Sequence, residues 1–278
     1  MDHPAVLAIV LTYCAPRSLA RCLEGIDSQT RPPDGLLVVD NTGPPLPTVD
    51  LLGAGSWPRR VVRTGENLGP AGGHARGLAE FLAEGRWTHA WVMDDDCVPE
   101  PDSLARLVDR AHSLPERSLV LPTWLDGYTR EVENAPAWCG FLVSRAAVEL
   151  VGLPRAELFW WCEDTEYLQF RMPRLGVAVV RERSARVWHW PVRRTAARPP
   201  WKIYYEVRNS TWYRLHVQRS PRAVRRWLLT IARVVAALLR DSPSRAHFSA
   251  LGLGLVHGIR GKLGRTMLPP LPPANSHR

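Results

Sequence analysis

The sequence predicts an α/β protein built on a mostly parallel sheet, followed by a helical region. Short apolar runs rich in β-branched residues alternate with amphipathic helical segments over the first hundred residues. The runs Ala5–Tyr13 and Leu36–Asn41 are almost entirely apolar, which is typical of parallel strands buried on both faces. A chain of 278 residues, 45% apolar and 23% charged, is long enough for one large domain with an appendage.

The first half of the chain alternates strands and helices in a regular order. Pro16 opens a helix after the first strand, and a loop rich in Pro and Gly follows the second. We then expect a short strand at Arg59–Thr64, a helix at Gly72–Gly85 with a glycine-rich start, and a fourth strand at Thr88–Asp96. Strands separated by helices predict right-handed crossovers and a parallel sheet.

The second half is less regular. Tryptophans and loops dominate Leu121–Trp161, apart from the apolar run Gly140–Ser144. A helix is expected at Glu163–Gly176 and a strand at Val177–Val180. From Trp201 onward the pattern is helical, and its amphipathic part has an apolar face that we expect to pack: Val224, Trp227, Leu228, Ile231, Val235 and Leu238.

Composition narrows the class of partner. The formal net charge is +9 and the pI is about 9.9, which favours an anionic partner such as a nucleotide, a nucleic acid or an acidic membrane surface. The five cysteines form no CxxC pair, so neither a disulfide framework nor a thiolate zinc site is indicated, and we expect a reducing cytosol. No stretch reaches the roughly 18–20 apolar residues of a membrane span.

Three consecutive acids, Asp94, Asp95 and Asp96, end the fourth predicted strand. On an extended chain Asp94 and Asp96 face the same side and could hold Mg²⁺ or Mn²⁺, while Asp95 faces the other side, toward a ribose. The alternative is a solvated strand end. His189 lies between two tryptophans and is either a third metal ligand or a packed core residue.

Two further features lie at or beyond the ends of predicted strands, where open α/β sheets bind ligands. Asp40 could accept hydrogen bonds from a base or a ribose, or could form an Asx turn. Gly69, Gly72 and Gly73 would allow the backbone to approach a phosphate at a helix N-terminus, or would form a simple loop and cap.

An acidic pair, Glu163 and Asp164, directly follows the segment that contains Trp160 and Trp161. Aromatic faces stack on sugars and exclude water, and exclusion of water raises the basicity of a carboxylate. One of these acids could therefore deprotonate a hydroxyl, or both could simply complement a helix dipole. A further group could line an acceptor pocket or belong to the core: Trp138, Cys139 and Gly140.

Taken together, these features resemble the inverting GT-A glycosyltransferases of glycosyltransferase family 2. The matching segments, in order, are IVLTYCAP, LLVVDN, NLGPAGG, WVMDDD, WCGF and WWCEDTEY. Within that family, four segments are most similar to bacterial galactofuranosyl- and rhamnosyltransferases: NLGPAGGHARG, WWCEDTEY, VWH and KIYYEVRN. The resemblance implies a GT-A fold, in which a Rossmann-like nucleotide-binding sheet continues into a mixed acceptor-side half.

The resemblance also implies roles on the donor side. Thr12 and Asp40 would contact the nucleotide, with Asp40 at the pyrimidine base. Asn67 and the loop at Gly69–Gly73 would lie near the base, the ribose and the diphosphate.

The metal and acceptor sides follow from the same resemblance. Asp94 and Asp96 would form the DXD-type metal motif, completed by His189. Asp164 would be the general base, with Glu163 beside it on the acceptor. The acceptor site would be shaped by two tryptophans, Trp160 and Trp161.

The resemblance thus implies an inverting hexosyltransferase that uses Mn²⁺ or Mg²⁺. It would move galactofuranose or rhamnose from a UDP- or dTDP-sugar to a glycan, a polyprenyl-linked glycolipid or a natural product, as in cell-envelope polysaccharide biosynthesis. We expect a GT-A catalytic domain at 1–198, a helical region at 199–266 for contact with the inner face of the membrane or with a homodimer partner, and a disordered tail at 267–278. The alternatives are a basic nucleic-acid-binding protein, although no nucleic-acid module is recognised, and a catalytically inactive GT-A scaffold.

Overall fold

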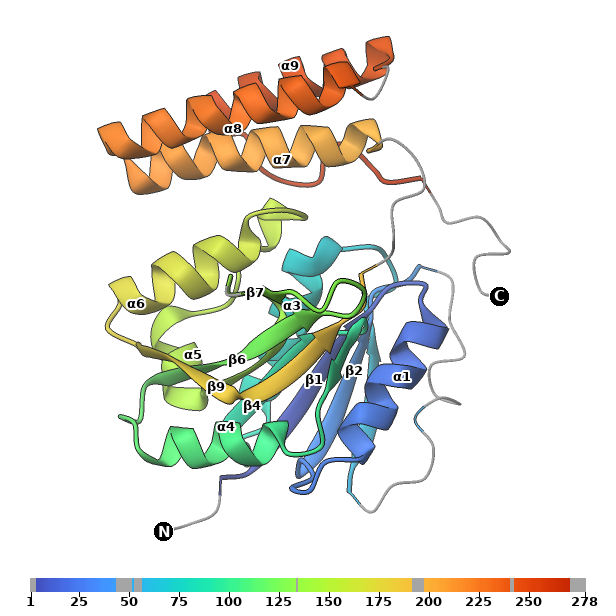
Figure 1. Cartoon of the computed structure of the whole chain (residues 1–278), viewed down its shortest axis with the longest axis vertical. Coiled ribbons are helices and arrows are strands. Elements are labelled where there is room, and N and C mark those ends of the chain that lie inside the picture. Colours follow the sequence, from blue (N-terminus) through green and yellow to red (C-terminus); the bar gives the residue numbers. More distant parts are fainter. Residues whose placement is uncertain are drawn as a thin grey trace.

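A mixed sheet forms the centre of the protein (Figure 1). The computed structural model describes residues 4–43, 52, 57–133, 135–191, 198–240 and 243–270. Within these residues the sheet has nine strands in the order β3-β2-β1-β4-β8-β6-β9-β5, and β7 pairs with β6.

The first half of the sheet is parallel, as predicted. β1 (Val6–Thr12) lies between β2 (Gly35–Asp40) and β4 (His89–Asp94), and β3 (Arg59–Arg63) lies outside β2. Every residue of β1 and β2 is buried, because helices cover both faces of this half.

The second half is mixed. β8 (Cys139–Ser144) runs antiparallel to β4 and to β6 (Ser118–Asp126), whereas β9 (Ala178–His189) runs parallel to β6. Two short strands complete the sheet: β5 (Cys97–Pro99) on β9 and β7 (Val132–Glu133) on β6. A parallel half joined to a mixed half is the expected GT-A architecture, which confirms the predicted fold class.

Two apolar cores separate the sheet from its helices. α1 (Pro16–Asp27) and α4 (Ser103–His112) cover one face. The other face is covered by α3 (Gly69–Ala83), by α5 (Arg145–Val151) and by a π-helical segment, Thr165–Arg171, which is followed by the short α6 (Met172–Arg174). Neighbouring residues of β1 point alternately into the two cores, because side chains alternate along a strand.

A layer of helices lies at one end of the molecule (Figure 1). It contains α7 (Pro200–Trp212), which continues as a π-helical turn at Tyr213–Gln218, followed by α8 (Pro221–Arg240) and α9 (Arg245–Ile259). A short 3-10 helix, Ala156–Leu158, lies between α5 and the π-helical segment. In the part of the chain that is described, no helix combines the length and the apolar character needed to cross a membrane.

The packed face of α8 differs from the predicted one. Ala223, Val234 and Leu238 are the buried residues of this helix. Leu238 packs as predicted, with Ile231 partly buried beside it, whereas Val224 and Leu228, which we also expected to pack, are 40% and 56% exposed. Only a narrow strip of α8 meets α7, so the apolar residues outside that strip face outward.

Two other expectations fall partly outside the described residues. These are the loop after Asn41, of which 44–51 lies outside, and the expected tail, of which 271–278 lies outside. Within the described part of that tail, the backbone oxygen of Met267 accepts a hydrogen bond from the Tyr205 hydroxyl at 3.0 Å.

Candidate active site

A cavity of about 590 Å³ opens at the carboxyl ends of β1 and β4. The acid triplet forms part of its wall, and Asn67 and Gly69 at the start of α3 form another part. Trp160 and Trp201 close its far side. The structure therefore brings the acids, one end of the glycine-rich segment and the aromatic segment into one place.

The acid triplet does not lie on an extended chain. β4 ends at Asp94, and Asp95 and Asp96 form a turn before β5 begins. The expected alternation of sides along a strand therefore stops after Asp94, and all three acids line the same cavity. Each of them has a different partner.

Asp94 is held by a histidine that the sequence analysis did not select. His74, on α3, is fully buried, and its Nε2 lies 2.8 Å from Asp94 Oδ1. Burial lowers the pKa of His74 to about 3, so the ring is neutral and Nε2 donates its proton to the carboxylate. Burial and the nearby Asp96 raise the pKa of Asp94 well above its ordinary value.

Trp138 lies against the ring of His74. The two rings stack with their centroids 4.0 Å apart, and Trp138 is only 4% exposed. Cys139 is buried, and the backbone oxygen of Gly140 accepts a hydrogen bond from Trp91 Nε1 at 3.0 Å. The structure therefore places Trp138, Cys139 and Gly140 in the core behind the acids rather than in an acceptor pocket.

Asp95 is fixed by Thr12. The Thr12 hydroxyl donates to Asp95 Oδ2 at 2.6 Å, and Thr12 is 1% exposed. Thr12 therefore orients an acid of the cavity wall, rather than offering a surface of its own to a nucleotide.

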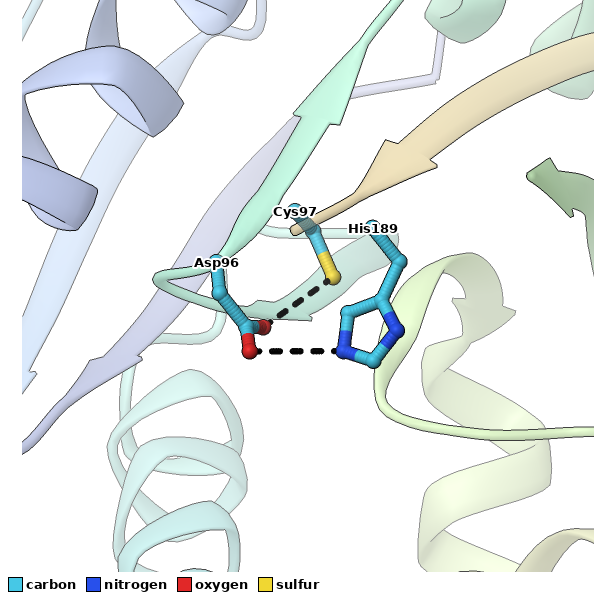
Figure 2. A group of neighbouring side chains, drawn as sticks. All are labelled: Asp96, Cys97 and His189. Atoms are coloured by element: carbon cyan, nitrogen blue, oxygen red, sulfur yellow. Dashed lines mark hydrogen bonds and ion pairs between the residues drawn. The ribbon is translucent and has the colours of Figure 1, made fainter. Parts of the chain in front are cut away.

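Asp96 and His189 form the part of the site best suited to a cation (Figure 2). His189 Nε2 lies 3.3 Å from Asp96 Oδ2. Burial alone would lower the pKa of His189, but the hydrogen bond and charge of Asp96 raise it. Carboxylate oxygens and an imidazole nitrogen suit Mn²⁺, and Asp94 on the same wall could add a further oxygen.

Cys97 lies beside this pair but is a poor ligand for a hard cation. Burial raises its pKa well above the ordinary value, so the thiol stays protonated. Its Sγ lies 3.0 Å from Cys139 Sγ and 3.8 Å from Asp96 Oδ1. The donor set therefore fits a hard divalent ion held by the acids and His189.

The nucleotide side differs in detail from the sequence expectation. Asp40 is fully buried, and its Oδ1 accepts from the backbone N–H of Thr42, as in an Asx turn. Its neighbour Asn41, not selected from the sequence, lines the cavity and donates through Nδ2 to the Gly69 backbone oxygen at 3.1 Å. Asn67 also lines the cavity and accepts from the Gly69 N–H at 2.8 Å.

The glycines lie inside α3 rather than before it. A Cβ on Gly73 would lie 2.3 Å from Leu11 Cδ1, and one on Gly72 would lie 2.6 Å from Leu68 Cβ. Gly69 has φ +69, and a Cβ there would lie 2.0 Å from the Phe159 oxygen. Gly72 and Gly73 therefore serve close packing, and Gly69 alone of the three lines the cavity.

A second cavity of about 460 Å³ lies beside the first. Trp160 lines both cavities, while Trp161, Glu163 and Asp164 line only the second. Burial, and then the neighbouring Asp164, raise the pKa of Glu163 well above its ordinary value. Burial also raises the pKa of Asp164, although hydrogen bonds from Thr165 oppose the shift.

The segment that leads into this acidic pair has an unusual backbone. Phe159, Trp161 and Cys162 have φ values of 62°, 76° and 74°. Such values cost of order 1–3 kcal/mol at each non-glycine residue and persist only where the surroundings impose them. The surroundings must therefore supply strong interactions.

Two adjacent residues of α7 supply them. Asn209 Nδ2 donates to the backbone oxygens of Leu158, Trp160 and Trp161 at 2.9, 2.8 and 2.9 Å. Arg208 donates through Nη2 to the Leu158 oxygen at 2.9 Å and through Nε to Asn209 Oδ1 at 2.7 Å. Both residues are fully buried. The segment KIYYEVRN, to which the sequence analysis assigned no role, thus holds the backbone that precedes the acidic pair.

Asn209→Ala is expected to loosen segment 158–162, from which Trp160 lines both cavities. Removing three backbone contacts should increase hydrogen exchange in this segment, and misplacing the acidic pair should slow sugar transfer by about 10²-fold. Thr211→Val is the matched control, because buried Thr211 accepts instead from Trp227 Nε1 on α8. Equal hydrogen exchange of segment 158–162 in the two variants would show that the Asn209 side chain does not stabilise this segment.

The sheet, the acid triplet and the acidic pair together define a glycosyltransferase of the GT-A class. The chain belongs to glycosyl transferase family 2, because the model of that family matches residues 7–150. Residues 151–270, which contribute Asp164, His189 and Asn209, lie beyond that match.

Curated relatives match part of the chain. A galactofuranosyltransferase GlfT1 of Mycobacterium tuberculosis (strain H37Rv) is 39% identical over 94 residues, which cover 33% of this chain and 30% of the relative. The GlfT1 of Mycolicibacterium smegmatis is 37% identical over 116 residues, 41% of this chain and 37% of the relative. The match therefore spans only about a third of the length of these relatives.

Solved structures share the fold at low identity. The mannosyltransferase PcManGT from Pyrobaculum calidifontis, in complex with GDP-Man and Mn²⁺, has a TM-score of 0.55 at 14% identity and covers 94% of this chain and 88% of its own. GalNAc-T7 with UDP, GalNAc and Mn²⁺ has a TM-score of 0.57 at 14% identity, covering 76% of this chain and 48% of its own. These likenesses extend the GT-A fold beyond the family match.

Proposed function

We propose that the protein is a metal-dependent inverting glycosyltransferase. It moves a sugar, with galactofuranose and rhamnose favoured, from a UDP- or dTDP-sugar to a hydroxyl of a glycan, glycolipid or natural product. The observation that carries the proposal is the pair of adjoining cavities, one lined by the acid triplet and the other by Glu163 and Asp164, with Trp160 in the wall of both.

The first cavity is the proposed donor site. The GlfT1 relatives support a galactofuranosyl donor, and the solved neighbours with nucleotide or nucleotide-sugar and Mn²⁺ support a metal-bound diphosphate. A Mn²⁺ or Mg²⁺ ion would stabilise the charge that develops on the departing nucleoside diphosphate. Asp96 and His189 would hold the ion with Asp94, which His74 orients.

The second cavity is the proposed acceptor site. Asp164 takes the proton of the acceptor hydroxyl as that oxygen attacks the anomeric carbon from the side opposite the diphosphate. A raised pKa makes Asp164 a stronger base than an ordinary aspartate. Glu163 lines the same cavity beside Asp164, so a second hydroxyl of the acceptor could bond to its carboxyl group.

The proposal also covers the cellular location of the protein and the role of its C-terminal helical region. Five free cysteines support a reducing cytoplasm. We also propose peripheral contact of the protein with the inner face of the membrane. The helical region from 199 to 266 would serve that contact, although Arg208 and Asn209 also tie it to the catalytic part.

Thermal unfolding tests the donor side. UDP and dTDP should raise the unfolding temperature with Mn²⁺ or Mg²⁺, and much less without either ion; GDP and ADP serve as comparisons. A ligand at about 100 times its Kd adds roughly 2.7 kcal/mol to the free energy of unfolding, which is readily measured. If no nucleotide acts with any metal, the proposed donor site is wrong.

A further inference from the structure

The positive charge of the protein is concentrated in its C-terminal helices. Residues 219–265 contain ten Lys and Arg and one acid, which gives +9, equal to the formal net charge of +9 of the whole chain. The preceding 218 residues contain 25 Lys and Arg against 26 Asp and Glu. The charge is therefore not a general property of the surface but belongs to one region.

α8 carries two apolar faces, and only one of them is packed. Ala223, Val234 and Leu238 are buried, and the last two pack in one cluster with residues of α7 and with partly buried residues of α9. The outward face exposes large apolar side chains to 40%, 56%, 47% and 64%: Val224, Leu228, Leu229 and Leu239. Val224, Leu228 and Leu239 lie on one face at helical spacing, with Ala232 and Val235 between them, and form a continuous stripe; Leu229 lies beside it.

Arginines lie along one side of that stripe, with Leu229 among them, and the packed face lies along the other side. α8 contains no acidic residue, and its arginines are all exposed: Arg222, Arg225, Arg226, Arg233 and Arg240. We call the four exposed apolar residues and these five arginines the α8 surface. Long arginine stems can lie along an apolar surface while their guanidinium groups reach outward to anionic groups.

We propose that the α8 surface binds an anionic lipid bilayer. An apolar stripe bordered by cations is the pattern of a helix that lies in the plane of a membrane, with leucines among the acyl chains and arginines at the phosphates. A second copy of the chain would bring two acid-free, arginine-lined faces together, and the repulsion disfavours it. Nucleic acid would leave the exposed leucines without an apolar partner.

This inference names the surface for the membrane contact that the proposed function includes, and it rests on the proposed acceptor site only for its consequence. Thr230 of α8 lines the second cavity together with Asp164. The helix that would lie on the membrane thus also forms part of the proposed acceptor site. Membrane binding itself requires no donor or acceptor, so it can be measured separately.

Co-sedimentation of the full chain with lipid vesicles tests the proposal. We expect at least about 10-fold stronger binding to phosphatidylcholine vesicles that contain phosphatidylglycerol than to phosphatidylcholine alone, and weaker binding at higher salt. The double variant Leu228→Ser/Leu239→Ser should lose most of the binding. Leu150→Ser/Leu175→Ser, which alters leucines 39% and 46% exposed elsewhere, should bind normally.

Two charge-reversal variants separate the effect of the α8 arginines on vesicle binding from the effect of the net charge of the protein. Arg225→Glu/Arg233→Glu should lower binding to anionic vesicles at least about 10-fold. Arg117→Glu/Arg183→Glu makes the same change in net charge at exposed positions near the sheet, and should have little effect.

Four outcomes would overturn the proposal. The first two are equal binding of the protein to both kinds of vesicle, and an equal loss of binding in both charge variants. The third is binding to DNA that the leucine variants do not change. The fourth is a dimer that does not bind vesicles and that only Leu228→Ser/Leu239→Ser dissociates. Each variant is also measured for the nucleotide-dependent rise in unfolding temperature. A retained rise with no vesicle binding rejects the membrane surface alone, and vesicle binding with no rise rejects the donor site alone.

Discussion

Asp164→Asn is expected to reduce the rate of sugar transfer by about 10²–10⁴-fold, the usual contribution of a general base. The amide keeps the size of the carboxylate and can still accept from the Thr165 N–H through its oxygen, so the fold should persist. The proposed site for nucleotide and metal is the other cavity, so their effect on the unfolding temperature should remain. The measurement is the initial rate of transfer with saturating donor, beside the unfolding curve.

The pH dependence gives the same prediction a second readout. A general base must be ionised, and burial raises the pKa of Asp164. Activity should therefore fall as the pH drops through a value above the ordinary aspartate pKa of about 4, while the plateau lies at higher pH. Glu157→Gln is the control, because Glu157 is an exposed acid of the same region that pairs with Arg155. Full activity in Asp164→Asn would show that another group takes the proton.

Asp96→Ala is expected to abolish the metal-dependent effect of nucleotides on thermal unfolding. Asp96 is the acid that lies against His189, and its loss would leave the proposed metal site with one imidazole and Asp94. Because a bound metal supplies several kcal/mol of charge stabilisation, sugar transfer should fall by about 10²–10³-fold or more. Mn²⁺ titration of nucleotide binding by calorimetry measures the loss directly.

A surface acid provides the comparison for Asp96. The Asp102 side chain is 41% exposed and pairs with Arg106 of α4, four residues later. Asp102→Ala removes a carboxylate of the same kind without touching either cavity, and should leave nucleotide binding unchanged. If Asp96→Ala retains the full metal dependence, the cation is held elsewhere.

Periodicity predicts the parallel half of the fold well and the mixed half poorly. β1, β2 and β4 are apolar runs whose burial on both faces shows directly in the sequence. β6 was missed because Pro122 and Trp124 interrupt its apolar pattern, at the point where its register with β9 shifts. β9 was predicted as a short strand because charged residues at partly or fully exposed positions follow directly after Val180: Arg181, Glu182, Arg183 and Arg186.

The sequence likewise predicts some residues of the candidate site and misses others. The acids lie at the ends of elements, so their positions follow from the order of strands and helices. Contacts across the fold leave no local pattern: nothing in the sequence near His74 shows that its ring lies against Asp94, twenty residues later. Trp138 and Asn67 illustrate the opposite outcomes, since both come from short matched motifs, yet one lies in the core and the other in the cavity wall.

The bonds from Arg208 and Asn209 limit how this enzyme could be divided or recombined. A boundary at residue 198 would cut between the strained segment and the side chains that hold it. The parallel half, whose strands and helices are close in sequence, could be exchanged with that of another family member as a module. Segment 158–162 could not be transplanted without α7. A change of acceptor preference should therefore require segment 158–162 and α7 to change together.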